Sequence, residues 1–485
     1  MTLKLYFFGG ISEVGGNKIL VDDNGTKIFL DFGISYSKKS MYFDLFVAPR
    51  SIGLLEDLGI IPRIKDLYSQ ALEDYFCCGK ELDFDKDPEP PVDAVFISHA
   101  HMDHIGHISL LSRKTRIYMG DCAQRILEAR AEAYRGSRSI DLVYDGLFDN
   151  IGTFHSFQRI NIGHTEIIPV HVDHSIPGAY GFIIRTSEGK DIVYTGDLRW
   201  HGEQRLTDDF VRELEKIGDV DCLITECTHV DYSGYVSEAE VMQKARSLVE
   251  SFDGNFIVDF SRTDYDRFFS FWQVSKDTDT YMVVDIDRWF IIRTIMGCRG
   301  IMKKLEESNL IIYLTKRMFR KGAVLSFIMD LVERDSGRVL KTDSLINREL
   351  KEKDSEIAFL HDFLNNVRRE GKKAIITIPR PGADILMKVI VGENVYIHAC
   401  SEPISEESVI TFEKLQNWLE IFGIPMYHIH SSGHITPLDL RKFVLTIEPK
   451  SIIPIHGERP GLLSRFIKKE SINWILPQYG SPIEL

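Results

Sequence analysis

Four residues of types that bind metal ions fall within six positions of this sequence: His99, His101, Asp103 and His104. They directly follow an apolar, strand-like run at residues 94–98. Alternate side chains of a strand point to the same face, so we expect His99 and His101 to point together. Asp103 and His104 then lie where the chain turns into a helix. This spacing can divide the ligands between two adjacent metal ions, two imidazoles to one and a carboxylate with an imidazole to the other.

The residue types also indicate which metal and which kind of site to expect. Imidazole and carboxylate without thiolate suit zinc or manganese held for catalysis rather than a closed structural zinc site. The seven cysteines are odd in number and form no Cys-x-x-Cys pair, so we expect reduced thiols of a cytoplasmic protein. A histidine-rich surface turn is the alternative, but four ligands at one strand end favour a metal-dependent hydrolase.

Two later segments also place a possible ligand just past a strand. His174 ends an apolar strand and enters a turn at residues 175–178. Asp197 follows the strand-like run that ends at Tyr194, and Gly196 beside it allows a close backbone approach. Each segment alone is weak, because an aspartate after a strand is more often a turn residue or a helix cap. Their recurrence at strand ends supports one shared site.

Length and composition limit the kind of protein. With 485 residues, 44% of them hydrophobic, the chain is too long for one ordinary core, and two or three packed domains are expected. A net charge of −14 argues against a surface that binds nucleic acid indiscriminately, although it leaves room for a local basic channel. No apolar run approaches the roughly 20 residues that cross a bilayer, and no signal peptide is visible. We therefore expect a cytoplasmic protein without membrane contact.

The pattern of strands and helices divides the chain into three regions. Residues 1–228 are rich in short β-branched strands between Gly and Asp turns, with a helical stretch near residues 52–78. In residues 229–402 helices alternate with apolar strands, which is typical of a parallel sheet, and a capping box at residues 237–240 opens the first helix. Residues 403–485 return to helix, strand and glycine turn. The sequence therefore predicts an α/β protein of three regions.

The order of these motifs resembles the metallo-β-lactamase superfamily. That superfamily's motifs are matched by Asp31, by His99-x-His101-x-Asp103-His104-x-Gly106, by His174 and by Thr195-Gly-Asp197. Three further segments resemble the added motifs of the β-CASP nucleases, namely Ile224–Thr228, Ser431–His434 and Pro454–Glu458. The residues around His174 and His456, and the amino-terminal run Gly9–Asn17, are most similar to ribonuclease J.

The resemblance implies a fold and a set of metal ligands. The fold is an αββα sandwich built by residues 1–228 and 403–485, with a β-CASP-like parallel-sheet domain inserted at residues 229–402. Two divalent ions, zinc or else manganese, would be bound in the sandwich. The implied ligands are His99, His101 and His174 for one ion, Asp103, His104 and His456 for the other, and Asp197 between the two. Little sequence follows His456, as in the short archaeal form of ribonuclease J.

The resemblance also implies catalytic roles. Glu226 would orient His434, His434 would contact the scissile phosphate and assist the leaving oxygen, and Asp31 would fix an imidazole rather than bind metal. Asp103 and Asp197 would act as catalytic metal ligands. Two divalent cations about 3.5–4 Å apart lower the pKa of a shared water, and the resulting hydroxide attacks phosphorus. General acid help from His434 is typically worth roughly 10²–10⁴-fold in rate. Taken singly, a strand-end carboxylate and a turn histidine explain Glu226 and His434 equally well.

The reaction that the resemblance implies is hydrolysis of single-stranded RNA, by exonuclease or endonuclease action, in a protein that could form homo-oligomers. Candidate substrate contacts are His430, Ser432, Ser401 and Arg267, and turn structure is at least as good an explanation for the first three. One segment departs from ribonuclease J. Where that family has a polar, glycine-rich run, residues 377–383 read Thr-Ile-Pro-Arg-Pro-Gly-Ala, so the family's usual RNA contacts are not expected there.

Two other functions fit parts of the sequence. A small-molecule hydrolase, such as a lactonase or thioesterase, would use the same metals under a cap domain, and the superfamily fold alone does not choose between these reactions. The acidic charge and the altered run at residues 377–383 favour that alternative, whereas Glu226, His434 and His456 favour a phosphodiester. A third hypothesis is a non-enzymatic RNA-binding protein with an inactive site. The presence of every expected metal ligand argues against it.

Overall fold

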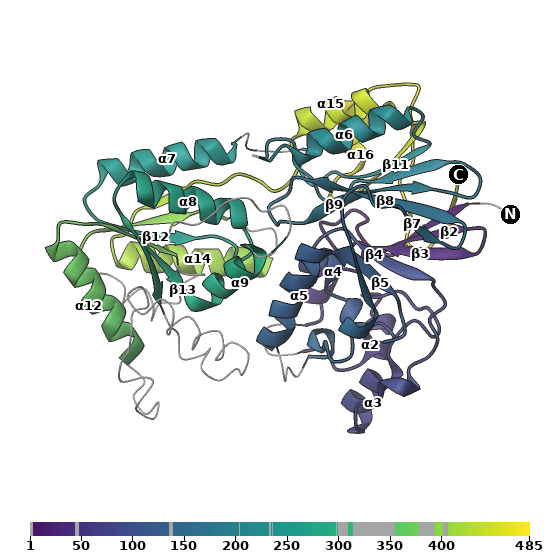
Figure 1. The fold of residues 1–485 in the computed structure, drawn as a ribbon, viewed down its shortest axis with the longest axis horizontal. Helices are drawn as coiled ribbons and strands as arrows, with labels where there is room; N and C mark the ends of the chain where they lie inside the picture. Colours follow the sequence, from purple (N-terminus) through teal and green to yellow (C-terminus); the bar gives the residue numbers. More distant parts are fainter. Residues whose placement is uncertain are drawn as a thin grey trace. The chain divides into compact units, whose positions relative to one another are not determined.

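The computed structural model of the chain divides into two compact units (Figure 1). Unit 1 comprises Met1–Gly234 and Gly433–Leu485, and unit 2 comprises Tyr235–Ser432. The described residues are all except 1–2, 44–47, 135–138, 203, 232–233, 235, 297, 299–308, 314–354, 378–391 and 401–405. Unit 2 starts near the predicted region boundary at residue 229 and ends beyond the predicted boundary at residue 402. The limits of the three regions stay predictions.

Unit 1 contains two seven-stranded sheets, and the first has the order β20-β1-β2-β3-β4-β5-β6. Its strands are β1 (Lys4–Phe7), β2 (Ile19–Asp23), β3 (Thr26–Leu30), β4 (Ala94–Ile97), β5 (Ile117–Gly120), β6 (Ile151–Phe154) and β20 (Ile483–Glu484). The pairs from β20 to β3 are antiparallel, whereas β3, β4, β5 and β6 are parallel neighbours. The four parallel strands therefore end at one shared edge.

The second sheet has the order β19-β18-β11-β10-β9-β8-β7. Its strands are β7 (Ile160–Ile162), β8 (Thr165–Val172), β9 (Ala179–Arg185), β10 (Asp191–Tyr194), β11 (Cys222–Glu226), β18 (Ser451–Ile455) and β19 (Asn473–Trp474). Here β10, β11, β18 and β19 are parallel, and β7 to β10 pair in antiparallel fashion. A second set of parallel strand ends is thus formed by segments far apart in the sequence.

Apolar side chains from both sheets interdigitate to form the core of unit 1. Phe96 of β4 meets Phe182 of β9 edge-on, with ring centroids 5.9 Å apart, and both side chains are fully buried. On the outer face of the second sheet, Phe210 stacks on Phe443 at 6.2 Å. These two residues belong to α6 (Leu206–Ile217) and α15 (Pro437–Ile447), which pack together. Burial of apolar surface between the layers is the main stabilising contribution.

Helices cover both outer faces of the paired sheets in unit 1 (Figure 1). Beside the first sheet lie α4 (Met102–Ile105) and α5 (Asp121–Tyr134), and α5 packs against β5 and β6. Beside the second sheet lie α6, α15 and the short α16 (Gly461–Phe466). Short 3-10 helices span Phe84–Lys86, Ile108–Leu110, Ile140–Leu142 and Phe148–Asn150. The predicted α/β fold class, with its helix–sheet–sheet–helix sandwich, is confirmed.

The helical stretch expected near residues 52–78 is two helices rather than one. They are α2 (Ile52–Asp57) and α3 (Gln70–Cys78), and a short α1 (Tyr36–Ser40) precedes them. Ser51 and Ser69 cap α2 and α3, because each side chain accepts a hydrogen bond from the backbone N–H of the third residue of its helix. Gly59, with φ of 65°, and Pro62 follow α2 and prevent its continuation.

Unit 2 is built on a six-stranded sheet in which every neighbouring pair is parallel, as the alternating pattern predicts. The order is β14-β13-β15-β12-β16-β17. The strands are β12 (Asn255–Asp259), β13 (Tyr281–Asp285), β14 (Leu310–Tyr313), β15 (Ala374–Thr377), β16 (Asn394–His398) and β17 (Met426–His428). Because all of them run the same way, their carboxyl ends form one edge.

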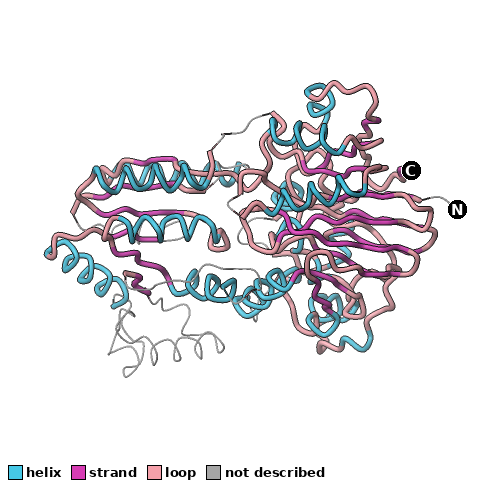
Figure 2. Tube along the Cα trace, turned by 45° about the horizontal axis from the view of Figure 1, so that its top comes forward, coloured by secondary structure: helices cyan, strands magenta, loops and turns pink. Residues whose placement is uncertain are grey.

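Helices lie on both sides of this sheet (Figure 2). They are α7 (Glu238–Ser251), α8 (Tyr265–Asp277), α9 (Ile286–Met296), α12 (Ser355–Arg369) and α14 (Glu406–Ile421). The predicted capping box is present, because the Ser237 side chain accepts from Glu240 N while the Glu240 side chain accepts from Ser237 N. Leu419 of α14 is buried in one apolar cluster with Ile257 and Tyr396, which fixes that helix against β12 and β16.

Two further expectations concern membranes and thiols. Among the described residues, no helix is long and apolar enough to cross a membrane. Five cysteines carry free thiols, namely Cys77, Cys78, Cys222, Cys227 and Cys400.

Candidate metal centre

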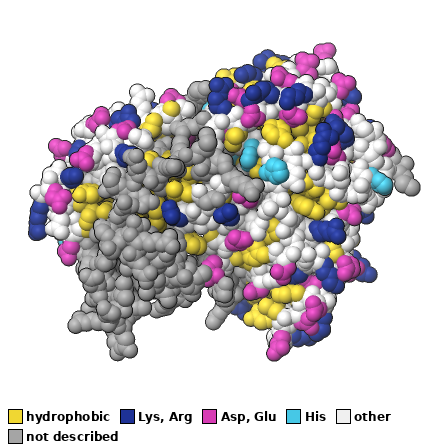
Figure 3. All heavy atoms as spheres, viewed as in Figure 1, with side chains coloured by type: hydrophobic (Ala, Val, Ile, Leu, Met, Phe, Trp, Pro, Cys, Tyr) yellow, Lys and Arg dark blue, Asp and Glu magenta, His cyan; other side chains and the backbone are white. Residues whose placement is uncertain are grey.

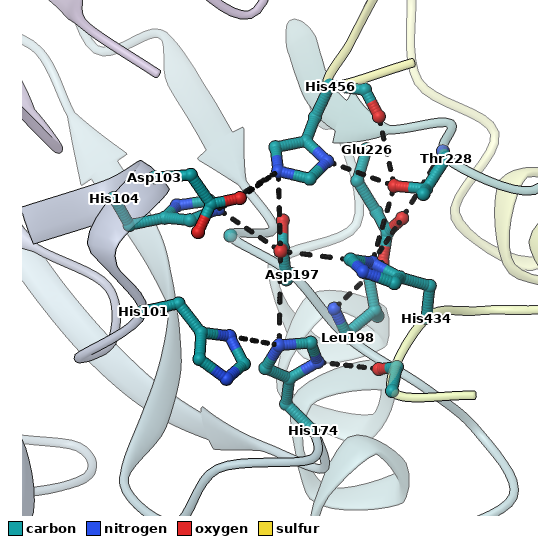
Figure 4. A network of polar contacts seen from close by, with 12 residues as sticks. His101, Asp103, His104, His174, Asp197, Leu198, Glu226, Thr228, His434 and His456 are labelled. Atoms are coloured by element: carbon teal, nitrogen blue, oxygen red, sulfur yellow. Dashed lines mark hydrogen bonds and ion pairs between the residues drawn. The ribbon is translucent and has the colours of Figure 1, made fainter. Parts of the chain in front are cut away.

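All seven predicted metal ligands lie in unit 1, close to the carboxyl ends of strands from both sheets, and Figure 4 labels every one of them except His99. The segment after β4 carries His99, His101 and the two α4 ligands, Asp103 and His104. The segments after β8, β10 and β18 carry His174, Asp197 and His456. The sandwich thus brings together residues that are more than 350 positions apart in the sequence.

The first group of donor atoms consists of three imidazoles. Nε2 of His99 lies 3.0 Å from Nδ1 of His101, and Nε2 of His174 lies 3.0 Å from the same Nδ1. The side chains of His99 and His174 are buried. Ligand nitrogens of a tetrahedral zinc, with bonds of about 2.0–2.1 Å, lie roughly 3.3 Å apart, so the spacing is close to that of a metal site.

The second group combines two imidazoles with two carboxylates. Nε2 of His456 lies 3.2 Å from Nε2 of His104 and 3.2 Å from Oδ2 of Asp103. Nε2 of His104 and Oδ2 of Asp103 are 4.0 Å apart. Donor atoms of Asp103, His104, Asp197 and His456 all lie within 4.8 Å of one another, which is the spacing of ligands around one cation.

Asp197 lies between the two groups. Its Oδ2 is 3.1 Å from Nε2 of His104 and 3.5 Å from Nε2 of His456. The same oxygen is 3.8 Å from Nε2 of His99 and 3.9 Å from Nε2 of His174. One buried carboxylate oxygen therefore faces donors of both groups, which is the arrangement that a bridging ligand requires.

The protonation of the first group suits a cation. Burial lowers the pKa of His99 and His174 well below the ordinary value, and it lowers the pKa of His101 to about 4. The three rings are therefore neutral at physiological pH, and each presents a lone pair. Two imidazole nitrogens can share one proton in a hydrogen bond. Three converging nitrogens cannot all find a hydrogen-bond donor among themselves. A divalent cation at their centre satisfies all three, so the residues fit a metal ion.

A hydrogen bond on the far side of the ring orients most of these imidazoles. The Nδ1 partners are Ser98 Oγ for His99 at 3.0 Å, Asp31 Oδ2 for His104 at 2.7 Å, Gly433 O for His174 at 2.5 Å and Thr228 Oγ1 for His456 at 2.9 Å. A partner at Nδ1 fixes the ring tautomer and leaves Nε2 for the centre. The structure therefore brings Asp31 to the place that its predicted role requires.

Asp31 is held by several donors at once. Its carboxylate accepts hydrogen bonds from Ser98 N and Ser98 Oγ, each at 2.7 Å, and from Tyr194 OH at 2.5 Å. Its backbone is in the left-handed region, with φ of 58°. Tyr194 and Thr228 are functional neighbours that the sequence reasoning missed, although both lie inside motifs that it used. Neither hydroxyl signals its role without the fold.

Glu226, which is buried, and His434, which is partly exposed, form a pair beside the two ligand groups. Both carboxylate oxygens of Glu226 approach Nδ1 of His434, at 3.2 and 3.1 Å, and Leu198 N donates to the same carboxylate at 3.1 Å. Burial opposes charging of His434, but the carboxylate of Glu226 outweighs it and raises the pKa of His434 to about 9. Nδ1 of His434 is 3.8 Å from Oδ2 of Asp197, which places a cationic ring beside the centre.

The amino-terminal glycine run packs against the segment that carries Asp103 and His104. The backbone N–H groups of Gly16 and Asn17 donate to the carbonyl of Asp103, at 3.0 and 3.2 Å. A Cβ on Gly33 would lie 1.6 Å from that same carbonyl oxygen, and a Cβ on Gly15 would lie 2.6 Å from the Asp103 side chain. Glycine is therefore required where the loop and the ligand segment touch.

The predicted substrate contacts have different outcomes. Arg267 is completely buried in unit 2 and pairs with Glu238 at 2.7 Å, and each guanidinium nitrogen donates to a protein acceptor. The predicted phosphate contact of Arg267 is therefore not supported, because its donors are already used inside the domain. His430 and Ser432 belong to unit 2, and Ser401 lies outside the described residues, so their roles stay predictions. Most of the altered run at residues 377–383 also lies outside them.

Comparisons with known proteins agree with this geometry. Residues 81–248 match the family model described as a beta-lactamase superfamily domain. The chain is 25% identical over 467 residues to ribonuclease J of Mycoplasma genitalium, covering 94% of this chain and 68% of that protein. It is 24% identical over 473 residues to ribonuclease J of Pyrococcus abyssi, covering 94% of this chain and 90% of that protein.

A solved structure adds support for the fold alone. A protein of unknown function from Enterococcus faecalis V583 has a TM-score of 0.70 and 22% identity over 100% of both chains. The sandwich and its ligand groups are similar to those of metallo-β-lactamase-type proteins, a class that implies bound divalent metal. Within that class, the chain is similar to ribonuclease J along 94% of its length, so the resemblance inferred from the motifs is confirmed.

Proposed function

We propose that this chain is a metal-dependent phosphodiesterase, a ribonuclease J-like enzyme that hydrolyses single-stranded RNA. The observation that carries the proposal is the position of Asp197 Oδ2, which faces both ligand groups and also lies 3.8 Å from His434 Nδ1. The relatives named ribonuclease J support RNA as the substrate. Cytoplasmic location and homo-oligomer formation remain expectations.

The proposed ligands are those implied by the motifs, with zinc as the first choice of metal and manganese as the second. His99, His101 and His174 would hold one ion, Asp103, His104 and His456 the other, and Asp197 would contact both. Two divalent ions so placed would lower the pKa of a water between them and neutralise charge on phosphate oxygens. Imidazole and carboxylate ligands without a thiolate favour this use over a closed structural site.

His434 is the proposed general acid. Its Nδ1 is hydrogen-bonded to Glu226, so the proton available to a substrate is the one on Nε2. A leaving oxygen that takes this proton departs as a neutral hydroxyl, which is worth roughly 10²–10⁴-fold in rate. The Glu226 carboxylate keeps the ring cationic at neutral pH and fixes its direction. Esters with better leaving groups need this help less, so the pair favours a phosphodiester.

A small-molecule metallo-hydrolase of the lactonase or thioesterase type is the second candidate. The net charge of −14 favours it, because phosphate backbones are repelled by acidic surfaces. On the face drawn in Figure 3, acidic and basic side chains of unit 1 are interspersed, without one dominant basic patch. The ligand groups serve either reaction, so the substrate must be tested directly.

The decisive experiment gives the metal-loaded protein 5′-labelled single-stranded RNA, single-stranded DNA, a lactone and a thioester. We expect RNA cleavage with zinc or manganese and none in the double variant Asp103→Ala with His104→Ala. The matched control is Asp209→Ala with Arg212→Ala, an exposed ion pair on α6 whose loss should leave cleavage unchanged. Intact RNA under both metals, together with lactone or thioester turnover, would replace the ribonuclease proposal with the second candidate.

Asp197→Asn tests the bridging role separately. The amide keeps the shape of the side chain but loses its negative charge, so both ligand groups lose their shared anion. We expect loss of bound metal together with nearly all RNA cleavage, whereas Asp209→Asn should retain both. Full metal content in the Asp197→Asn protein would contradict the proposed bridge.

A further inference from the structure

A second cluster of possible metal ligands lies in unit 2, apart from the residues proposed for catalysis. Donor atoms of Asp259, His398 and Cys400 all lie within 4.8 Å of one another. Oδ2 of Asp259 is 3.9 Å from Nδ1 of His398. Asp259 and His398 are 2% and 3% exposed, so this carboxylate and imidazole meet in the interior, where charge must be compensated.

The sheet itself produces this cluster. Asp259 is the last residue of β12 and His398 is the last residue of β16, and the two are direct partners in the parallel register. Partners in neighbouring strands point to the same face of a sheet, and Cys400 follows His398 by two positions. Ala399 N donates to Asp259 O at 2.8 Å, which holds the turn carrying Cys400 against the end of β12.

The thiol is already directed toward β12. Sγ of Cys400 lies 3.5 Å from the carbonyl oxygen of Asp259, and Cys400 carries a free thiol that is partly exposed. His428 on β17 occupies the next place in the same row, opposite His398, and its Nε2 lies 3.1 Å from Cys400 O. The turn is therefore fixed from both neighbouring strands, which limits the entropy lost when a ligand binds.

From this geometry we infer that unit 2 binds a zinc-class divalent cation through Asp259, His398 and Cys400. Carboxylate, imidazole and thiolate are all ligands of zinc, with bonds of about 2.0–2.3 Å. A deprotonated thiol and a carboxylate together offset the two positive charges of the ion, so the buried site becomes neutral. Three protein ligands leave a fourth position for water.

The nearby Arg288 interacts with part of this cluster as well as with partners of its own. Arg288 is buried beside the same sheet edge, where it pairs with Asp285 at 3.6 Å and donates to Phe260 O at 2.9 Å and Ser261 O at 3.3 Å. Burial lowers the pKa of Arg288, and the negative groups that oppose this effect are Asp285 first, then Asp259 and Cys400, so the guanidinium also acts on the cluster. The alternative for Asp259 and His398 is a simple buried ion pair, which would bind no metal and would not involve the thiol.

Cobalt substitution distinguishes the metal site from the simple ion pair, because thiolate ligation gives cobalt(II) an intense near-ultraviolet charge-transfer absorption. The proposed catalytic ligands include no cysteine, so this band reports only on the new site. We expect the band in the full-length protein and in the Asp103→Ala with His104→Ala variant, and its loss in Cys400→Ser. The exposed neighbours Cys77 and Cys78 provide the control, since Cys77→Ser with Cys78→Ser should leave the band intact.

Zinc content gives an independent measurement that uses no catalytic readout. After dialysis, the Asp103→Ala with His104→Ala protein should hold one zinc ion per chain more than the same protein with His398→Gln added, because the His99, His101 and His174 group is unchanged in both. In the wild-type protein, zinc should slow alkylation of Cys400, and a chelator should restore the rate. No cobalt band, or alkylation of Cys400 that is indifferent to zinc, would overturn the inference and leave an ion pair. These outcomes do not depend on whether the protein cleaves RNA.

Discussion

Both carboxylate oxygens of Glu226 lie within hydrogen-bond distance of Nδ1 of His434, at 3.2 and 3.1 Å. Glu226 ends β11, whereas His434 lies in the segment before α15, more than 200 positions later. The same carboxylate accepts from Leu198 N, the residue next to Asp197. One buried acid therefore sets the charge and direction of His434 while it is itself tied to the segment that carries the central aspartate.

Removal of the Glu226 charge should shift the pH dependence of catalysis. The carboxylate raises the pKa of His434 to about 9, so the cationic ring is lost only as pH rises through that value. In Glu226→Gln the pKa falls, and the basic limb of kcat/KM should move to lower pH. At pH 8 we expect kcat/KM to fall by roughly 10²–10⁴-fold, which is the rate enhancement that a general acid typically provides.

The pH profile of kcat/KM for RNA, measured from pH 5 to 10, checks this shift. Glu213→Gln on the surface of α6 is the matched control and should keep the wild-type profile. A basic limb that stays in place in Glu226→Gln would show that Glu226 does not govern the protonation of His434.

Loss of Asp31 should weaken metal binding without removing a ligand. Asp31 pairs with Nδ1 of His104 at 2.7 Å and also accepts from Tyr194 OH. Substitution of such an outer partner typically lowers metal affinity or activity about 10–100-fold. We expect this loss for Asp31→Asn and a smaller one for Tyr194→Phe, which removes a single hydrogen bond. Zinc competition with a chromophoric chelator measures both, and equal affinity of Asp31→Asn and wild type would refute the role.

A methyl group at Gly33 should disturb the ligand segment. Its Cβ would lie 1.6 Å from the carbonyl oxygen of Asp103, a contact that only backbone movement can relieve. Overpacking of this kind typically costs about 1–3 kcal/mol, and here the shift would reach Asp103 and His104 directly. Gly33→Ala should therefore lose both stability and metal affinity. The control is Gly53→Ala in α2, where a Cβ meets nothing closer than 3.7 Å and both properties should persist.

The buried lysine Lys18 should make stability depend on pH. Burial lowers its pKa from 10.5 to about 7, and its ammonium group donates to the carbonyls of Gly16 and Gly33. Below pH 7 both folded and unfolded chains hold the proton, so the folded state carries the full burial penalty. Between pH 7 and 10.5 the folded lysine is neutral, and the penalty shrinks by about 1.4 kcal/mol per pH unit.

The free energy of unfolding of the wild type should therefore rise with pH relative to that of Lys18→Met. Urea unfolding at pH 7, 8 and 9 compares the two proteins, and Lys65→Met, at a lysine side chain with 92% exposure, serves as the control. Parallel pH profiles of wild type and Lys18→Met would mean that Lys18 is already solvated in the folded state.

Much of the fold and the centre could be predicted because local patterns encode them. The strand ending before His99, the alternation that produces the parallel sheet of unit 2 and the capping box at Ser237 all follow from residue periodicity and spacing. The break between α2 and α3 was missed, although Gly59 and Pro62 are local signals for it. Sequence also shows the positive charge of Arg267 but not its burial against Glu238.

The sequence by itself determined the types of ligand and their order along the chain, because residue identity and strand spacing suffice for that. Tertiary structure alone decided that Asp197 faces both groups, that Glu226 meets His434 and that Tyr194 holds Asp31. It also placed Asp259 beside His398 and Cys400. The physical reason is that these contacts join strands whose pairing depends on burial of the whole core, a property that no short segment carries.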